Sequence, residues 1–186
     1  MKRTEGSRAV DALLEFIAIS SVTALSLVAP NAWVAFDKPL SKFLKKMDER
    51  ERRREIQRLL RYVKNKNLVS WDYEHGLKLT NKAKERLKNL DYINLEIKPL
   101  EKWDGKWRIV FFDVPEQKKH SRDGFSAKLK KIGMIPIQRS VFVHPDPCRD
   151  EVLLAADHFS IRRFVSYIET THLENDKALK PRFNLK

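Results

Sequence analysis

The apolar pattern at the start of the chain is that of one buried helix. Residues 16–29, FIAISSVTALSLVA, carry no charge, and Asp11 and Glu15 interrupt the apolar positions just before them. An uncharged run of 14 residues suits a core helix better than a membrane span or a signal peptide. We therefore predict a helix over residues 8–28 that ends before Pro30, is apolar on both faces and has no membrane partner.

Two more helices are predicted before residue 66. The first of these is short, spans 39–48 after Pro39, and turns Phe43, Leu44 and Met47 to one side. The charge run 48–55 leads into the next helix, whose apolar positions recur at helical spacing and should face a core. These apolar positions are Ile56, Leu59, Leu60 and Val63. The opposite, exposed face carries Arg54, Arg58, Arg61 and Asn65, flanked by Gln57 and Lys64.

A β-hairpin and a further helix follow the basic helix. Strands are predicted over 68–72 and 77–80 around a Glu74-His75-Gly76 turn, and Thr80 or Asn81 should cap the next helix. Helix, helix, basic helix, hairpin, helix is the order of a winged helix-turn-helix. Residues 10–90 resemble winged-helix regulators, most specifically in LKLTNKAKERL. The resemblance implies that the basic helix enters a DNA major groove and that the hairpin is the wing, with His75 and Lys78 on it.

The second half alternates strands and helices after an extended connector over 91–106, which has a strand-like alternation of its own. The predicted elements are strand 107–113, helix 118–133, strands 134–138 and 140–144, helix 148–159 and strand 163–170. The order β-α-β-β-α-β is the ferredoxin-like arrangement, in which both helices cover one face of an antiparallel sheet. The other face should be open and apolar, and should dimerise or dock another element. It would carry some of Trp107, Ile109, Phe111, Val141 and Val143.

The charge of the chain is concentrated in its middle. The net charge is +13 and the isoelectric point is near 9.9. Residues 41–102 hold 18 basic against 10 acidic side chains, and residues 103–145 hold 9 against 4, whereas both ends are neutral. A localised basic region indicates a polyanionic partner, most often nucleic acid. The one cysteine, Cys148, cannot form an internal disulfide, which favours a reducing, cytoplasmic location.

The segments around the first strand and the hairpin of the second half resemble a known domain. They are WRIVFFDVPE (107–116), Arg122, and IGMIPIQRSVFVHP (132–145). This domain is shared by the phenylacetic-acid-degradation repressor family (PaaX) and the small CRISPR-associated endonuclease of spacer acquisition, and the resemblance covers residues 103–171. IQRSVFV is closer to the nuclease branch. The winged-helix-like sequence in front is closer to PaaX.

Asp113, which ends the first strand of this domain, has two interpretations. An aspartate before Val-Pro can cap the loop or the free N–H groups of the next helix. In the nuclease branch, the resemblance implies that two such carboxylates meet across a two-fold axis and hold a divalent ion. Glu116 and Asp123 are the neighbouring acids, and the sequence does not place them near Asp113. The scattered histidines suggest no further ligand set.

The sequence therefore predicts an α+β protein with a winged helix-turn-helix over 1–90, a linker over 91–106, a ferredoxin-like dimerisation domain over 107–174 and a tail over 175–186. The resemblance implies a PaaX-type repressor that binds double-stranded DNA as a homodimer without a cofactor. The predicted DNA-binding residues are Arg54, Arg58, Arg61, Lys64, His75 and Lys78. The alternative is an Mg²⁺-dependent CRISPR-associated nuclease or spacer-acquisition subunit that uses Asp113.

Overall fold

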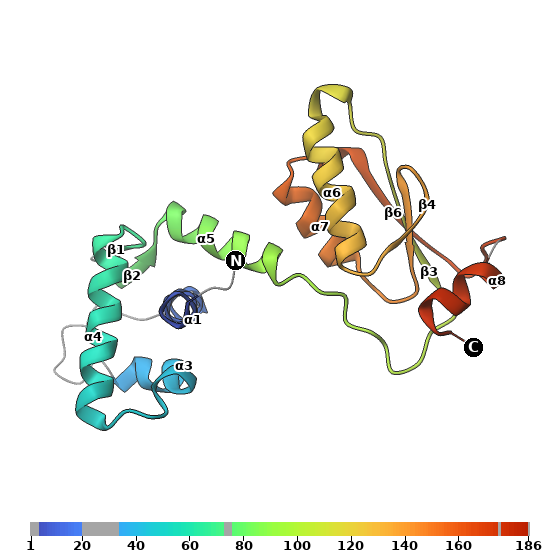
Figure 1. Ribbon diagram of the computed structural model, residues 1–186. Coiled ribbons are helices and arrows are strands. Elements are labelled where there is room, and N and C mark those ends of the chain that lie inside the picture. The colour runs from blue at the N-terminus through green and yellow to red at the C-terminus, as the bar shows by residue number, and fades with distance from the viewer. Residues whose placement is uncertain (1–3, 20–33, 73–75, 175, 186) are drawn as a thin grey trace. The chain divides into compact units, whose positions relative to one another are not determined.

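The protein has an α+β fold with two compact units, Met1–Leu90 and Asp91–Lys186 (Figure 1). The computed structural model describes residues 4–19, 34–72, 76–174 and 176–185. The first unit is mainly helical and contains one β-hairpin, and the second contains a four-stranded sheet. Each unit is built around its own hydrophobic core.

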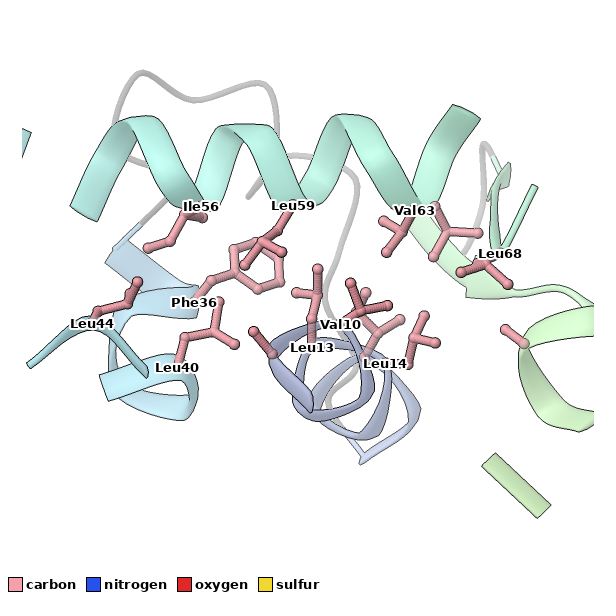
Figure 2. Packing of buried hydrophobic residues seen from close by; sticks show 14 residues of the cluster. Val10, Leu13, Leu14, Phe36, Leu40, Leu44, Ile56, Leu59, Val63 and Leu68 are labelled. Atoms are coloured by element: carbon pink, nitrogen blue, oxygen red, sulfur yellow. The ribbon is translucent and has the colours of Figure 1, made fainter. Parts of the chain in front are cut away.

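The first helix, α1 (Glu5–Ile19), is a core helix, as its apolar pattern predicts. Leu13 and Leu14 are completely buried and lie at the centre of the first core (Figure 2). The helix begins earlier than predicted, and the predicted helical residues 20–28 lie outside the described residues. None of the helices in the described parts of the chain combines the length and the apolar composition that crossing a membrane requires.

The second described helix, α3 (Val34–Leu44), contradicts the prediction that a helix begins at Pro39. The proline lies in the middle of α3, where it removes a backbone hydrogen bond at a cost of about 3 kcal/mol. Three apolar side chains of α3 recur every four residues and are buried. They are Phe36, Leu40 and Leu44. Burial contributes roughly 1.5–3 kcal/mol for each of them, which outweighs the cost of the proline. Met47, predicted to face inward, is exposed after the helix.

The third described helix, α4 (Glu49–Asn65), confirms the predicted apolar stripe. The Asp48 carboxylate accepts the Glu51 N–H at 2.8 Å, and the Glu51 carboxylate accepts the Asp48 N–H at 3.1 Å, which forms a capping box at the start of the helix. Three side chains of the stripe are fully buried, and Leu60 is half-buried at its edge. The buried residues are Ile56, Leu59 and Val63. Figure 2 shows them pointing toward Phe36 on α3 and toward α1.

The chain after α4 forms the predicted hairpin and helix. The elements are β1 (Val69–Asp72), β2 (Gly76–Leu79) and α5 (Asn81–Ile93). The strands are antiparallel, with Val69 opposite Leu79. The Thr80 hydroxyl accepts a hydrogen bond from the Ala83 N–H at 3.3 Å, so Thr80, one of the two predicted candidates, caps α5. The predicted turn residues 74–75 lie outside the described residues.

A buried ion pair joins α5 to α1. The Nε of Arg86 donates to Asp11 Oδ1 at 2.7 Å, and its Nη2 donates to the Ser7 carbonyl and hydroxyl oxygens at 3.3 and 3.2 Å. A buried carboxylate needs such a partner because it has lost its water. Asp11, a charge within an apolar helix in the sequence, is therefore part of the packing of the first unit.

The second unit follows the predicted element order. Its elements are β3 (Trp107–Phe112), α6 (Lys119–Lys131), β4 (Ile135–Gln138), β5 (Val141–His144), α7 (Arg149–His158) and β6 (Val165–Thr170). The strands lie in the order β4-β5-β3-β6 and every neighbouring pair is antiparallel. Helices α6 and α7 cover one face of this sheet (Figure 1), where Val110 and Phe112 of β3 pack against Phe125 and Leu129 of α6.

The opposite face of the sheet is not open along its whole length, so that prediction was wrong in part. The C-terminal segment, α8 (Asp176–Leu179) and the following 3-10 turn (Lys180–Phe183), packs on it. Its apolar side chains bury the part of the face that holds Trp107, Ile109 and Val143. The sequence pattern missed this contact because the segment is short and mostly polar. Phe111 and Ile168 on the same face remain exposed.

The connector over 94–106 contains no strand, although its alternation of apolar and polar residues allowed one. Leu95 and Ile97 pack against the core of the second unit instead. Asp104 is anchored by Arg108, whose buried Nη1 donates to Asp104 Oδ1 at 2.8 Å and also to the Pro145 carbonyl oxygen. The connector is therefore fixed to the end of β3 by one guanidinium group.

Asp104→Asn should destabilise the second unit by about 1–3 kcal/mol, because the Arg108 charge, whose side chain is 3% exposed, loses its closest carboxylate. Glu169 remains as a weaker partner, with its Oε1 at 3.7 Å from Arg108 Nε. The Arg108 hydrogen bonds lower the pKa of Asp104. The wild type should therefore hold this stabilisation above about pH 4 and lose it as pH falls through the folded pKa.

Urea unfolding at pH 7 and at pH 3 measures this contribution. The difference between Asp104→Asn and the wild type should shrink at the lower pH. Asp123→Asn, at a carboxylate that is 59% exposed, is the matched control and should change stability by less than about 0.5 kcal/mol. Equal effects of the two substitutions would contradict the assigned role of Asp104.

Candidate nucleic-acid interface

The exposed side of α4 carries a row of long cations. Because Ile56, Leu59 and Val63 face the core, the residues half a turn away face solvent. Arg54 and Arg61 are exposed there, and neither forms an ion pair or hydrogen bond within the described residues. Lys64 is exposed in the same way. The structure thus brings three of the predicted DNA-binding residues together on one helix.

The position of α4 on the first unit is set at its N-terminal end. Four residues, 45–48, separate α3 from α4, and the last of them is the capping residue. Arg52 Nη1 donates to Asp37 Oδ2 at 3.2 Å, which ties the first turns of α4 to α3. A short turn between two packed helices is typical of a helix-turn-helix motif. The cations of α4 therefore project from a supported helix.

Arg58, which the sequence placed with the free cations, is engaged by a carboxylate. Its Nη2 donates to Glu55 Oε1 at 2.6 Å and its Nε donates to Glu55 Oε2 at 2.7 Å. This fork-shaped pair lowers the pKa of the Glu55 carboxyl chiefly through the hydrogen bonds from Arg58. Arg58 remains 60% exposed but is already partly neutralised. Residue spacing of three on a helix could have indicated this pair from the sequence.

The two flanks of the exposed side differ in charge. At 100° per residue, Arg53, Gln57 and Lys64 lie on one flank, and Glu51 and Glu55 lie on the other. The sequence interpretation named Gln57 and Lys64 beside the central row but missed the carboxylates of the other flank. A polyanion that approaches α4 therefore meets cations on one side and carboxylates on the other.

A hollow of about 360 Å³ adjoins the basic flank where α4 meets the hairpin. The apolar side chains of Val63 on α4 and Leu77 on β2 line the hollow. Arg61 and Lys64 of α4 line it too. Lys78 is exposed on β2 opposite Ser70 of β1. The hairpin and the basic flank of α4 are therefore neighbours, whereas His75 lies outside the described residues.

Asp113 is exposed at the end of β3, and its carboxylate caps nothing in the described parts of the chain. Its backbone N–H donates to the Phe164 carbonyl oxygen at 3.1 Å. The predicted loop cap is therefore wrong. The nearby acids are held elsewhere, since Arg122 binds Glu116 at 3.0 Å and Asp123 at 3.4 Å.

The residues around Asp113 do not fit a divalent ion within one chain. No group of three histidine, cysteine or acidic side chains among the described residues could hold a metal. One exposed carboxylate is too few ligands for Mg²⁺, which needs near-octahedral oxygen coordination. Asp113 as a metal ligand stays a prediction that depends on a carboxylate from a second copy.

Three further reactive side chains, Cys148, His144 and His158, belong to the packing of the second unit. Cys148 is completely buried, and burial raises the pKa of its thiol to about 12, so it is not a nucleophile at neutral pH. Burial also lowers the pKa of His144, whose Nδ1 accepts the Asp146 N–H at 3.1 Å. His158 stacks on the ring of Tyr92 with centroids 3.7 Å apart.

Asp113→Asn should change the free energy of unfolding by less than about 0.5 kcal/mol, because the exposed carboxylate has no partner to lose. Thermal unfolding with and without millimolar Mg²⁺ checks both interpretations of this residue. A melting temperature that rises with Mg²⁺ in the wild type but not in Asp113→Asn would support a metal site shared by two copies, and an equal response of the two proteins would contradict the predicted metal-binding role of Asp113.

Comparison with known proteins gives one match, which lies in the second unit. Residues 100–180 match the family model of the PaaX protein central Cas2-like domain. This match confirms the resemblance to the PaaX family and its CRISPR-associated relatives for that part of the chain. No curated protein and no solved structure matched the chain.

Proposed function

We propose that this protein is a PaaX-type transcription regulator that binds double-stranded DNA as a dimer. The observation that carries the proposal is the group of exposed cations on α4, of which Arg54, Arg61 and Lys64 have no partner within the described residues. A capped helix start and a buried apolar stripe hold them outward. The PaaX-type domain over residues 100–180 supports a regulator of this family. The net charge of +13 favours a polyanionic partner.

The first unit acts as a winged helix in this proposal. Its elements run in the required order, with α3, a four-residue turn and α4, then the hairpin β1–β2 and α5. In such a motif the second helix enters the major groove while the hairpin contacts the flanking backbone. Helix α4 is the recognition helix and Lys78 contributes from the wing. The hollow beside Arg61 and Lys64 leaves both cations accessible from the hairpin side.

The second unit acts as the dimerisation domain. Its element and strand order is that of a ferredoxin-like fold, and the face opposite α6 and α7 is apolar. The C-terminal segment covers only part of this face, and Phe111 and Ile168 stay 41% and 46% exposed. We propose that a second copy covers them. Two copies related by a two-fold axis suit a palindromic DNA site.

The double substitution of Arg54→Ala with Arg61→Ala should weaken DNA binding and flatten its salt dependence. Each phosphate contact contributes about 0.9 to the slope of log K against log salt concentration, so the slope should fall by about two units. Fluorescence anisotropy with a duplex at several salt concentrations measures it. Lys130→Ala with Lys131→Ala removes the same charge from exposed positions on or beside α6 and should leave the slope unchanged. Equal slopes for all three proteins would exclude α4 from the interface.

Phe111→Glu should prevent dimer formation, because it puts a charge into the apolar face proposed to be shared. Sedimentation equilibrium should give the wild type twice the 21.9 kDa mass of one chain. The variant should have the mass of one chain. Lys119→Glu, a charge change at the start of α6 on the other side of the sheet, is the control and should remain dimeric. A monomeric wild type at micromolar concentration would contradict the proposed dimer.

A further inference from the structure

The Glu55–Arg58 pair should weaken the attraction between α4 and DNA phosphates. A carboxylate beside a polyanion is repelled, and the pair also occupies one of the arginines. The Glu55 side chain is only 25% exposed, so covering it with DNA would remove its remaining water. When Glu55 is covered it keeps the two bonds from Arg58, but its remaining lone pairs lose their water. Docking of DNA on this flank of α4 is therefore favoured where the DNA offers Glu55 a further donor.

The donors that DNA presents in the major groove are amino groups. The N4 amino group of cytosine and the N6 amino group of adenine are the two donors on base edges, whereas phosphate and sugar oxygens of the backbone only accept. Glu55 can therefore be satisfied by particular bases but not by the DNA backbone. A carboxylate at this place makes binding depend on base identity, which contacts to phosphate do not achieve.

The donors and acceptors of the pair restrict which base pairs it can read. Each carboxylate oxygen of Glu55 accepts one bond from Arg58 and retains capacity for a second. Arg58 Nη1 has no partner within the described residues and can still donate. An acceptor and a donor therefore stand side by side. Both C·G and A·T pairs present a donor next to an acceptor. Carboxylates pair with the N4 amino group of cytosine, which lies next to the O6 of guanine, whereas adenine is read by Asn and Gln, so C·G is the better match.

Resting on the DNA-binding function proposed above, we propose that Glu55 is a specificity-determining residue of α4 that accepts a hydrogen bond from the N4 amino group of a cytosine. Arg58 is its positioning residue, because the fork holds the carboxylate in one orientation, and Arg58 also donates to the guanine of the same pair. Arg54 and Arg61 then supply phosphate contacts that are indifferent to sequence.

Selection from a pool of randomised duplexes, followed by sequencing, tests this assignment. The wild type should enrich sites with a C·G pair at one fixed position. Replacing that pair by T·A should weaken binding by about tenfold to a hundredfold, the usual discrimination of a good base contact. Glu55→Gln should lose this discrimination to less than about threefold while it binds the pool at least as tightly, because it removes a negative charge.

Two further variants separate base reading from general effects of charge and structure. Glu15→Gln removes the same charge from an exposed position on α1 and should retain the full preference for C·G. Arg58→Lys keeps the charge but cannot form the two-bond fork, so it should reduce the discrimination and leave the salt slope of binding unchanged. Circular dichroism of each variant should match the wild type.

The outcomes distinguish the two proposals. A wild type that binds DNA and a Glu55→Gln variant that keeps the same base preference would overturn the role of Glu55 and leave DNA binding intact. The pair would then be only a stabilising contact on the helix surface. A wild type that neither binds the pool nor enriches any site would overturn both proposals.

Discussion

The packing of the apolar stripe of α4 against α1 and α3 is the constraint on which the functional surface depends. Ile56, Leu59 and Val63 are buried at regular helical spacing, so the rotation of α4 about its axis is fixed. The cationic residues that alternate with these apolar residues along α4 therefore face solvent. Since Phe36 of α3 meets these side chains (Figure 2), the helix that carries the cations cannot turn without opening the core.

Electrostatics then divides the exposed side of α4 into groups with different roles. Arg54 and Arg61 have no partners within the described residues and retain their full charge for a polyanion. Arg58 shares its charge with Glu55, so the two form a hydrogen-bonding unit with both acceptor and donor capacity. General attraction and base discrimination need these two kinds of group, because phosphate contacts carry no sequence information.

Regular hydrophobic spacing made most of the fold predictable from the sequence. The apolar stripe of α4, the hairpin, the Thr80 cap and the alternation of strands and helices after residue 107 all follow from local patterns. The predicted helix start at Pro39 was wrong because burial of the apolar side chains of α3 outweighs the low helix propensity of proline. The cover on the sheet face was not predictable, since its short C-terminal segment has no periodic pattern and is held only by tertiary contacts. Among the site residues, the exposed cations were found, but the Glu55–Arg58 pair and the uncapped Asp113 carboxylate needed coordinates.

Side-chain NMR of the arginine Nε–Hε groups during titration with duplex DNA tests the central claim most directly. Resonances of Arg54 and Arg61 should shift, because these groups exchange water for phosphate oxygens. The Arg86 resonance should stay in place, since its Nε is bonded to the buried Asp11 carboxylate at 2.7 Å. Unchanged signals of Arg54 and Arg61 in a sample where DNA is bound would show that α4 is not the DNA-binding surface.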